Sequence, residues 1–258
     1  MLLVVDVGNT QTVIGLLDDG AIVAAWRIAT VRHRTADELA GLLQGFFSLM
    51  GERLKDLVDA MAMASVVPAL TTRWVTMAEK HLGITPFVIG PGIRTGMRLL
   101  LKNPTEVGAD RIANAVAALE TYGAPVIVVD FGTSTNFDVV NGDGDYVGGS
   151  IAPGVEVSME ALTTRAARLT KVDIAEPDHA IGRDTLEALQ SGAVYGFAGQ
   201  VDGIAEAIRS ELGVAAQVVA TGGLAALIAP HSHTISTVDA SLTLRGIDLI
   251  MRRQAAAH

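Results

Sequence analysis

A short pattern that occurs twice constrains this chain more than any other feature. Near the N-terminus an apolar run leads into Asp6, and a tight polar turn over residues 8–10 follows at once. A second apolar run leads into Asp130, which is followed by the glycine, threonine and serine of residues 132–134. Each copy predicts a buried strand that delivers an acid and a turn at its carboxyl end, where α/β folds place ligand sites. Two similar α/β halves are therefore expected.

The predicted elements also repeat in order, with three strands joined by tight turns ahead of a helical region and a further strand in each half. A capping box of Thr35 and Glu38 marks the start of the first helix. The expected strands cover residues 2–7, 13–17, 21–28, 58–67, 86–89, 126–130, 135–140, 146–151 and 214–220. The other expected helices cover residues 69–82, 104–122, 154–167, 184–211 and the chain from 241. This order predicts duplicated α/β domains over 1–120 and 121–258.

The composition excludes several classes of protein. Half of the 258 residues are hydrophobic and 18% are charged, so the chain can bury a large core. The net charge of −9, without a cluster of Lys and Arg, argues against a nucleic-acid partner. The absence of cysteine excludes disulfides, and no apolar run reaches the roughly 20 residues of a membrane span. The N-terminus reads as a strand and not as a signal peptide, so we expect a cytoplasmic protein without a membrane partner.

Both turns suit a polyphosphate ligand. In the first, Gly8 lets the backbone approach a ligand, polar residues 9, 10 and 12 add donors, and Asp6 can orient a hydrated Mg²⁺. The alternative is an ordinary hairpin with an acidic turn residue. In the second, Asp130 ends an apolar strand, where a carboxylate is costly unless it is paired, hydrogen-bonded or bound to a metal. A later strand and turn over residues 220–223 offers paired glycines that could admit an adenine ring.

The absence of two common glycine motifs limits the kinds of nucleotide-binding site that the chain can form. The chain contains neither the P-loop pattern GxxxxGK[S/T] nor the Rossmann glycine fingerprint. A nucleotide enzyme with this sequence is therefore expected to be of the actin and hexokinase type, which uses opposed hairpins to hold phosphates.

The segment VGADR at residues 107–111 carries a second kind of chemistry. Transfer of a phosphoryl group to a hydroxyl needs a carboxylate near the nucleophile, and Asp110 can serve as that base. Arg111 can hold a substrate carboxylate with two hydrogen bonds. The alternative is a helix-start aspartate, stabilised by the helix dipole, followed by a surface arginine.

Taken together, the motifs resemble the type III pantothenate kinases, a family of the acetate and sugar kinase/Hsp70/actin superfamily. The resemblance spans nearly the whole chain in family order. It is carried by DVGNTQT (6–12), GIRTG (92–96), NPTEVGADRIANAVAA (103–118), VVDFGTSTNFDVV (128–140), GGSIAPGV (148–155), IGRDT (181–185), SGAVYGFAGQVDGI (191–204) and TGGLA (221–225). It implies duplicated ribonuclease H-like (actin-like ATPase) domains, each a mixed sheet flanked by helices, with the nucleotide cleft between them.

The resemblance also implies a role for each matching residue. Asp110 would be the catalytic base, Asp130 would bind the monovalent cation (K⁺ or NH₄⁺), and Asp6 would bind Mg²⁺ through water. The residues implied for ATP binding are Asp6, Val7, Gly8, Asn9, Thr10, Gln11, Thr12, Val13 and Thr133. The residues implied for pantothenate binding are Gly108, Ala109, Asp110, Arg111 and, across a dimer interface, Thr185. For Thr185 a role as an N-cap or first-turn residue of the next helix remains open beside this one.

The chain departs from the family pattern at three positions. Leu101 stands where family members usually carry a tyrosine that lines the pantothenate site, which removes a hydroxyl from that pocket. Asn136 replaces a usual threonine, and Thr170 replaces the proline of a Leu-Pro pair. None of the three changes the acids or the arginine with implied roles.

Four further ionisable residues lie near these motifs. Asp138 and Asp184 are expected to be turn or helix-start residues, and His231 and His233 are expected to be loop residues without metal-ligand spacing.

The sequence thus predicts an ATP-dependent kinase that phosphorylates pantothenate in the first step of coenzyme A synthesis. One alternative is another small-molecule kinase of the same fold, and a second is a non-catalytic nucleotide-binding or regulatory homologue. The family resemblance also implies a homodimer. The helix over residues 191–204 is rich in glycine and alanine, which favours close packing against a copy of itself, although an ordinary core helix has the same composition.

Overall fold

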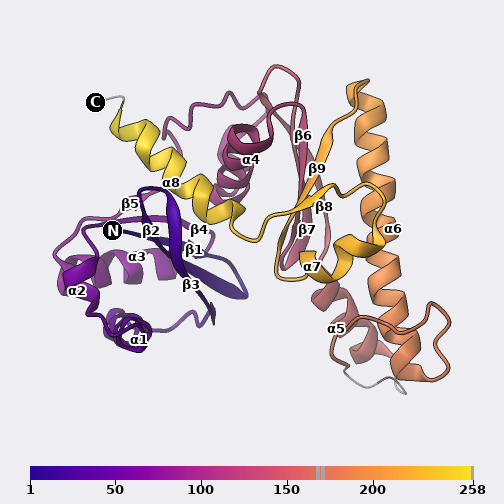
Figure 1. Cartoon of the computed structure of the whole chain (residues 1–258), viewed down its shortest axis with the longest axis horizontal. Coiled ribbons are helices and arrows are strands. Elements are labelled where there is room, and N and C mark those ends of the chain that lie inside the picture. The colour runs from indigo at the N-terminus through magenta and orange to yellow at the C-terminus, as the bar shows by residue number, and fades with distance from the viewer. Residues whose placement is uncertain (167–168, 170–171, 257–258) are drawn as a thin grey trace. The chain divides into compact units, whose positions relative to one another are not determined.

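The computed structural model describes residues 1–166, 169 and 172–256. The chain forms two compact units. The first comprises Met1–Gly96, Asn103–Ala117 and Leu242–His258, and the second comprises Met97–Lys102 and Ala118–Ser241 (Figure 1). Within the described residues, no helix combines the length and the apolar character that crossing a membrane requires.

The first unit is built on a five-stranded mixed sheet with the order β3-β2-β1-β4-β5. Its strands are β1 (Leu2–Val7), β2 (Gln11–Asp18), β3 (Ala21–Ala29), β4 (Ala60–Ser65) and β5 (Phe87–Val88). The strands β1, β2 and β3 pair antiparallel, as tight hairpins require, whereas β4 lies parallel to β1. The turn between β2 and β3 places Asp19 and Gly20 at positive φ, which suits the twist of a two-residue hairpin.

Helices cover both faces of this sheet. They are α1 (Ala36–Leu49), α2 (Leu54–Leu57), α3 (Pro68–Met77), the π-helix η1 (Ala78–Leu82), the 3-10 helix η2 (Pro104–Glu106), α4 (Ala109–Tyr122) and α8 (Leu242–Ala255). The predicted capping box starts α1, since Thr35 and Glu38 exchange both hydrogen bonds. The core between α1, α3 and the sheet contains Leu3, Val5 and Trp74, each at most 1% exposed. On the other face, a Cβ at Gly15 would lie 2.8 Å from a methyl of Leu244, so α8 packs directly on β2.

The second unit repeats this plan. Its sheet has the order β10-β9-β6-β7-β8, in which the antiparallel hairpins and the parallel neighbours recur around the central strand β6. Its strands are β6 (Val126–Phe131), β7 (Ser134–Val140), β8 (Tyr146–Pro153), β9 (Gln217–Gly222) and β10 (Thr237–Val238). Read in reverse, this strand order matches that of the first sheet, which confirms the duplicated ribonuclease H-like plan.

One face of the second sheet is covered by helices. The second unit holds α5 (Val155–Arg165), α6 (Thr185–Leu212), α7 (Ala225–Ile228) and the 3-10 helix η3 (Ala229–His231) (Figure 1). Ile127 and Val129 of β6 share a core with Val201 of α6 and Ile228 of α7, all four fully buried. The opposite side chains of β6, including Asp130, therefore point to the other face of the sheet.

The compact units differ from the division expected at residue 120, since Met97–Lys102 and Ala118–Ser241 belong to the second unit. The C-terminal helix α8 belongs to the first unit because it packs on α4 there (Figure 1). A Cβ at Gly246 would overlap the Ala113 carbonyl, and the Thr243 hydroxyl donates a 2.7 Å hydrogen bond to Asn114.

Candidate active site

The first predicted phosphate loop follows β1, the central strand of the first sheet. Asp6 is the penultimate residue of β1, is half-buried and lies opposite Val13 of β2. The Gly8 amide donates to the Gln11 carbonyl at 3.0 Å, and a Cβ at Gly8 would lie 2.8 Å from that oxygen. The Thr30 hydroxyl donates to the Gly8 carbonyl at 2.8 Å, which fixes the loop to the end of β3. A side chain at residue 8 would therefore press on the Gln11 carbonyl, which gives Gly8 a role within the turn itself.

The segment around Asp110 lies at the same edge of the first sheet. The Val66 amide donates to the Val7 carbonyl at 3.0 Å, so the chain leaves β4 beside the end of β1. A Cβ at Gly108 would meet Val66 at 3.5 Å and would collide with the Asp110 carboxylate. The structure therefore brings Asp6 and Asp110, more than a hundred residues apart in sequence, to one edge of one unit.

Asp110 lies in the first turn of α4, directly after Ala109. Its Oδ1 accepts a 2.8 Å hydrogen bond from the Arg111 backbone amide. Burial raises the pKa of the Asp110 carboxyl, and this effect outweighs that hydrogen bond and the Arg111 charge, which both lower it. A carboxylate with a raised pKa is a better proton acceptor than an ordinary surface aspartate.

The second predicted loop lies in the second unit, where Asp130 occupies the position on β6 that Asp6 occupies on β1. Thr221 is opposite Asp130 on β9, and the Gly223 amide donates to the Phe131 carbonyl at 3.1 Å. A Cβ at Gly222 would lie 2.6 Å from both Asp130 Oδ1 and the Phe131 carbonyl oxygen. The late glycine turn and the second loop are therefore neighbours, and any side chain at residue 222 would collide with both oxygens.

Thr133 and Thr185 also belong to the second unit and are both exposed. The Thr133 carbonyl accepts a 3.2 Å hydrogen bond from Gly154, which ties the loop to the start of α5. Thr185 is the first residue of α6, after Asp184, whose side chain caps the helix by accepting from the Glu187 amide at 2.9 Å. The reading of Asp184 as a helix-start residue is thereby confirmed.

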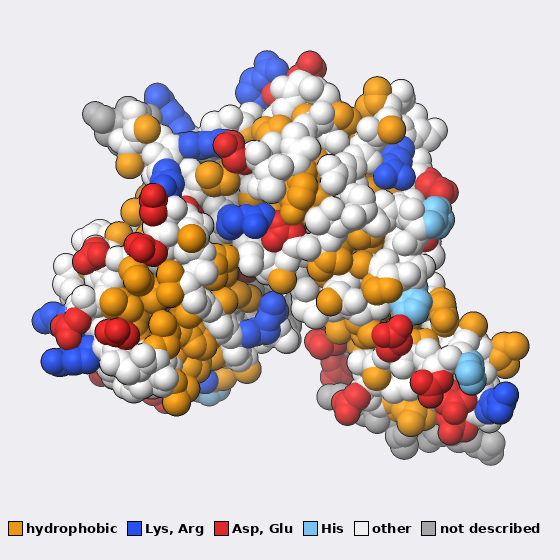
Figure 2. Space-filling model, in the orientation of Figure 1, with side chains coloured by type: hydrophobic (Ala, Val, Ile, Leu, Met, Phe, Trp, Pro, Cys, Tyr) orange, Lys and Arg blue, Asp and Glu red, His pale blue; other side chains and the backbone are white. Residues whose placement is uncertain are grey.

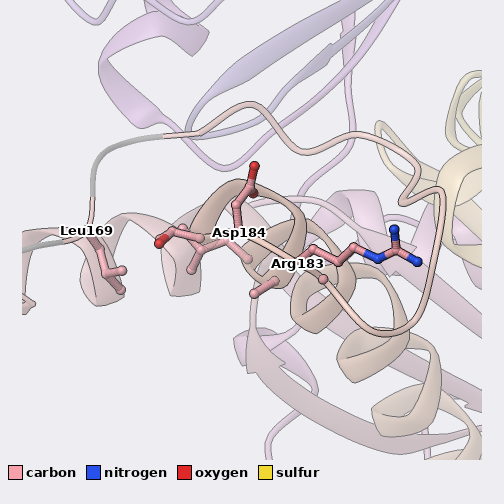
Figure 3. Close-up of a pocket in the computed structure, with 7 residues that line it drawn as sticks. Leu169, Arg183 and Asp184 are labelled. Atoms are coloured by element: carbon pink, nitrogen blue, oxygen red, sulfur yellow. The ribbon is translucent and has the colours of Figure 1, made fainter.

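Thr185 lines an open pocket of about 440 Å³. Leu169, Gly182, Arg183, Asp184, Ala188 and Leu189 complete its lining. Figure 3 shows that the Arg183 side chain extends away from Leu169. The lining of the pocket thus includes the Thr185 hydroxyl, the Asp184 carboxylate and the Arg183 guanidinium beside apolar side chains.

The interpretation of Asp138 as a turn or helix-start residue was wrong. Asp138 lies within β7, is fully buried and accepts a 2.7 Å hydrogen bond from the hydroxyl of Tyr146, which is itself 1% exposed. This partner, on the neighbouring strand, satisfies Oδ1 of a buried acid, whereas Asp138 Oδ2 is buried without a hydrogen bond among the described residues.

Two of the three departures from the family pattern lie in described residues. Leu101 packs beside β8, where a Cβ at Gly148 would lie 3.4 Å from its methyl group. Asn136 accepts a 2.9 Å hydrogen bond from the Ser134 hydroxyl. Thr170 lies outside the described residues.

Of the two histidines expected in loops, His231 instead ends the 3-10 helix η3, and both lie near carboxylates. His233 lies between two carboxylates, 2.8 Å from Asp202 and 2.8 Å from Glu206, and His231 lies 3.4 Å from Glu176. Among the residues that the structure describes, no three His, Asp or Glu side chains form a group suited to hold a metal ion.

Two basic side chains that the sequence did not single out contact the first loop. Arg27 Nη1 donates to the side-chain oxygen of Gln11 at 2.6 Å, and Arg32 Nη2 donates to that of Asn9 at 3.4 Å. The sequence predicted a strand over residues 21–28 but neither contact, because both depend on how distant residues are placed.

Comparison with known proteins decides the family of this chain. A family model described as type III pantothenate kinase matches residues 2–207. The chain belongs to the type III pantothenate kinase family. A type III pantothenate kinase from Streptomyces avermitilis is 50% identical over 260 residues, covering 98% of each chain. Others are 46% identical in Halalkalibacterium halodurans, covering 98% of this chain and 99% of the relative, and 47% identical in Myxococcus xanthus, covering all of both.

Solved structures share the fold of this family member at low sequence identity. A putative Baf family transcriptional activator from Campylobacter jejuni has a TM-score of 0.59 at 16% identity, covering 98% of this chain and 99% of that chain. Component A of (R)-2-hydroxyglutaryl-CoA dehydratase from Acidaminococcus fermentans has a TM-score of 0.56 at 15% identity, with 98% of each chain covered. These likenesses confirm the actin-like fold and say nothing about the reaction.

Proposed function

We propose that this chain transfers the γ-phosphoryl group of ATP to the primary hydroxyl of pantothenate, the first step of coenzyme A synthesis. Membership of the type III pantothenate kinase family supports the substrate. The observation that carries the chemistry is the position of Asp110, a half-buried acid with a raised pKa at the sheet edge where Asp6 and the first loop lie. A base and a phosphate-binding loop at one edge are what phosphoryl transfer to an alcohol requires.

In the proposed reaction, Asp110 accepts the proton of the pantothenate hydroxyl as its oxygen attacks the γ-phosphorus. The bond between that phosphorus and the leaving oxygen of ADP breaks in line with the attack. Arg111, which follows the base in α4, would pair with the carboxylate of pantothenate, and Gly108 and Ala109 would contact the substrate through their backbone.

The first loop would hold the triphosphate. The proposed ATP contacts in the first unit run from Asp6 through Val13, with backbone amides and the side chains of Asn9, Thr10 and Gln11 as donors. The hydroxyl of Thr12 is buried and hydrogen-bonded to that of Thr30 at 2.9 Å, so Thr12 would contribute through its backbone. When bound, Mg²⁺ would neutralise phosphate charge, and the Asp6 carboxylate is the hard oxygen ligand available to orient its water shell. In the second unit, Thr133 is the proposed ATP contact.

Asp130 is the proposed ligand of a monovalent cation, K⁺ or NH₄⁺. The donor set supports this role, because Asp130 Oδ1 and the Phe131 carbonyl oxygen lie close together beside Gly222. Carboxylate and carbonyl oxygens are the ligands that alkali cations take in proteins. A cation there would also relieve a carboxylate that ends a strongly apolar strand.

We further propose a cytoplasmic homodimer in which Thr185 reaches the pantothenate of the partner. At four glycines of α6, namely Gly192, Gly196, Gly199 and Gly203, no atom of the described residues would lie within 4 Å of a Cβ, so another helix could approach closely. Light scattering on Gly196→Leu tests this proposal. Loss of the dimer supports it, and an unchanged mass, or a monomeric wild type, contradicts it.

One observation favours a second acceptor. Leu101 replaces the tyrosine expected in the substrate pocket, so an acceptor with a less polar group could bind better than pantothenate. Competition between pantothenate and analogues of altered polarity measures this directly. A higher kcat/KM for an analogue would change the assigned substrate but leave the kinase chemistry intact.

A further inference from the structure

One side chain on the site face of the first sheet has no role in the proposed reaction. Arg27 lies opposite Val13 on β2, and Val13 lies opposite Asp6 on β1. Residues directly opposite one another in a sheet share a face, so Asp6, Val13 and Arg27 form one row. Strands are spaced by about 4.8 Å, which puts the Arg27 backbone roughly 10 Å from that of Asp6.

Arg27 lies among small, apolar side chains on its face of β3. It is the single charged residue of β3, and its neighbours on the same face, Val23, Ala25 and Ala29, are exposed. Figure 2 shows hydrophobic side chains gathered over these strands. The opposite face of the sheet is closed by the core beneath α1 and α3.

The contact of Arg27 with Gln11 determines how Gln11 is oriented. A guanidinium group has only donors, so the group 2.6 Å from Arg27 Nη1 must be the amide oxygen of Gln11. The amide NH₂ of Gln11, two donors, is then turned away from Arg27. Arg32 makes the same kind of contact with Asn9, the other amide side chain of the loop, at 3.4 Å.

We propose that Arg27 is a positioning residue that holds Gln11 with its NH₂ group towards a phosphate oxygen of the nucleotide. The inference rests on the proposed function of the first loop as a triphosphate site. Without Arg27 the Gln11 amide can rotate and present its oxygen, which repels a phosphate. The guanidinium also offsets the two acids of this edge, Asp6 and Asp110, against a strongly anionic ligand.

The alternative role for Arg27 is protection of an edge. β3 is the outermost strand of its sheet, and a charged side chain on such a strand discourages pairing with another chain. Lysine serves that purpose equally well but lacks the planar fork that fixes an amide. The two roles therefore differ in what Arg27→Lys does to nucleotide affinity.

Steady-state kinetics on a small set of variants tests the proposal. Arg27→Leu and Gln11→Leu should each raise KM for ATP about tenfold, the size expected for one hydrogen bond to a charged group, with kcat within about twofold. The double variant should be no worse than either single variant, because both remove one coupled unit. Arg27→Lys should restore only part of the affinity. Gln11→Glu should be worse than Gln11→Leu, since it keeps a partner for Arg27 but turns an anionic oxygen to the phosphate.

Arg53→Ala is the matched control. Arg53 is exposed, 3.6 Å from Asp56, and precedes α2, where the Leu57 carbonyl accepts from the N-terminal amine at the opposite end of β1. An unchanged KM for ATP in Arg27→Leu, full rescue by lysine, or multiplied effects in the double variant would each overturn the proposal.

Titration calorimetry with Mg–ATP alone separates this inference from the proposed function. If the wild type binds Mg–ATP but does not phosphorylate pantothenate, the proposed reaction fails, while the same rank order of Kd among the variants supports the role of Arg27. A wild type that binds no Mg–ATP overturns both.

Discussion

The backbone amide of Val66 donates a 3.0 Å hydrogen bond to the carbonyl of Val7, and this bond aligns two distant segments of the first unit. It joins the chain leaving β4 to the end of β1, one residue after Asp6. Val66 also fills the space beside Gly108, so the segment that carries Asp110 rests against the same edge. The proposed base and the first loop are thus held by one parallel strand pair.

The first prediction concerns catalysis by Asp110. Replacement by asparagine keeps the shape and removes the proton acceptor, so kcat should fall by about 10²–10⁴-fold with little change in KM for ATP. Asp56→Asn, which changes an exposed acid in α2, is the control and should retain full activity. Near-normal kcat in Asp110→Asn would remove Asp110 from the role of base.

The second prediction concerns the stability cost of that acid. Because burial raises the pKa of Asp110 above its ordinary 3.8, the folded state binds more protons than the unfolded state between those two values. Stability therefore falls as pH rises through that window, and the charged form is a net cost at neutral pH. Asp110→Asn should be more stable than the wild type in urea at neutral pH, with the difference vanishing in acid. A less stable variant at neutral pH would contradict the burial effect.

The third prediction concerns His233. Glu206 and Asp202 contact its two ring nitrogens, and together they raise the pKa of His233 above its ordinary 6.5. A raised folded-state pKa gives stability that is fully present below 6.5 and is lost as pH rises through the folded value. His233→Gln should thus lower the unfolding midpoint more at about pH 6 than at about pH 9. Glu206→Gln should weaken this pH dependence, and an equal loss at both pH values would contradict it.

The pKa of the neighbouring Asp202 shifts in the opposite direction, downwards. Burial raises the pKa of Asp202, but hydrogen bonds from Ser232 and Thr234 and the His233 amide outweigh this effect and lower it. Its stabilising contribution is therefore present above its ordinary pKa and is lost in acid. This places the maximum effect of the His233 contact in the weakly acidic range, where both groups are charged.

The fourth prediction concerns the buried pair in the second unit. Tyr146→Phe removes the hydroxyl that donates to Asp138 at 2.7 Å, where both residues are at most 1% exposed. Loss of this bond to a buried acid should cost about 1–3 kcal/mol of unfolding free energy in urea. Tyr195→Phe is the control, since Tyr195 is 40% exposed and its ring, not its hydroxyl, packs edge-on against His231. Equal effects of both changes would show that the Asp138 contact contributes nothing.

Much of the fold was predictable because its central strands are uninterrupted apolar runs followed by acids and glycines. The hairpins, the capping box at Thr35 and the start of α6 at Asp184 depend on neighbours in sequence, and each was predicted. The short elements α2, α7 and β10 were missed, since four or two residues are too few for a periodicity to emerge.

Features that depend on distant contacts were not accessible from the sequence. Asp138 was misread because its partner Tyr146 is on another strand. The place of α8 in the first unit depends on the close approach of Gly246 to Ala113. The contact of Arg27 with Gln11, and its place in one row with Asp6, depend on strand register and were therefore not predicted. The candidate site was identified through motifs, whereas the surroundings that orient those motifs required the structure.

Formation of 4′-phosphopantothenate from pantothenate, Mg²⁺ and ATP, measured by mass spectrometry with K⁺ and with K⁺ replaced by Na⁺, tests the central claim most directly. The account predicts product with the wild type in K⁺, a large loss in Na⁺ and with Asp130→Ala, and formation slower by about 10²–10⁴-fold with Asp110→Asn. Absence of product from the folded wild type in K⁺, or phosphorylation of another acceptor in strong preference to pantothenate, would contradict it.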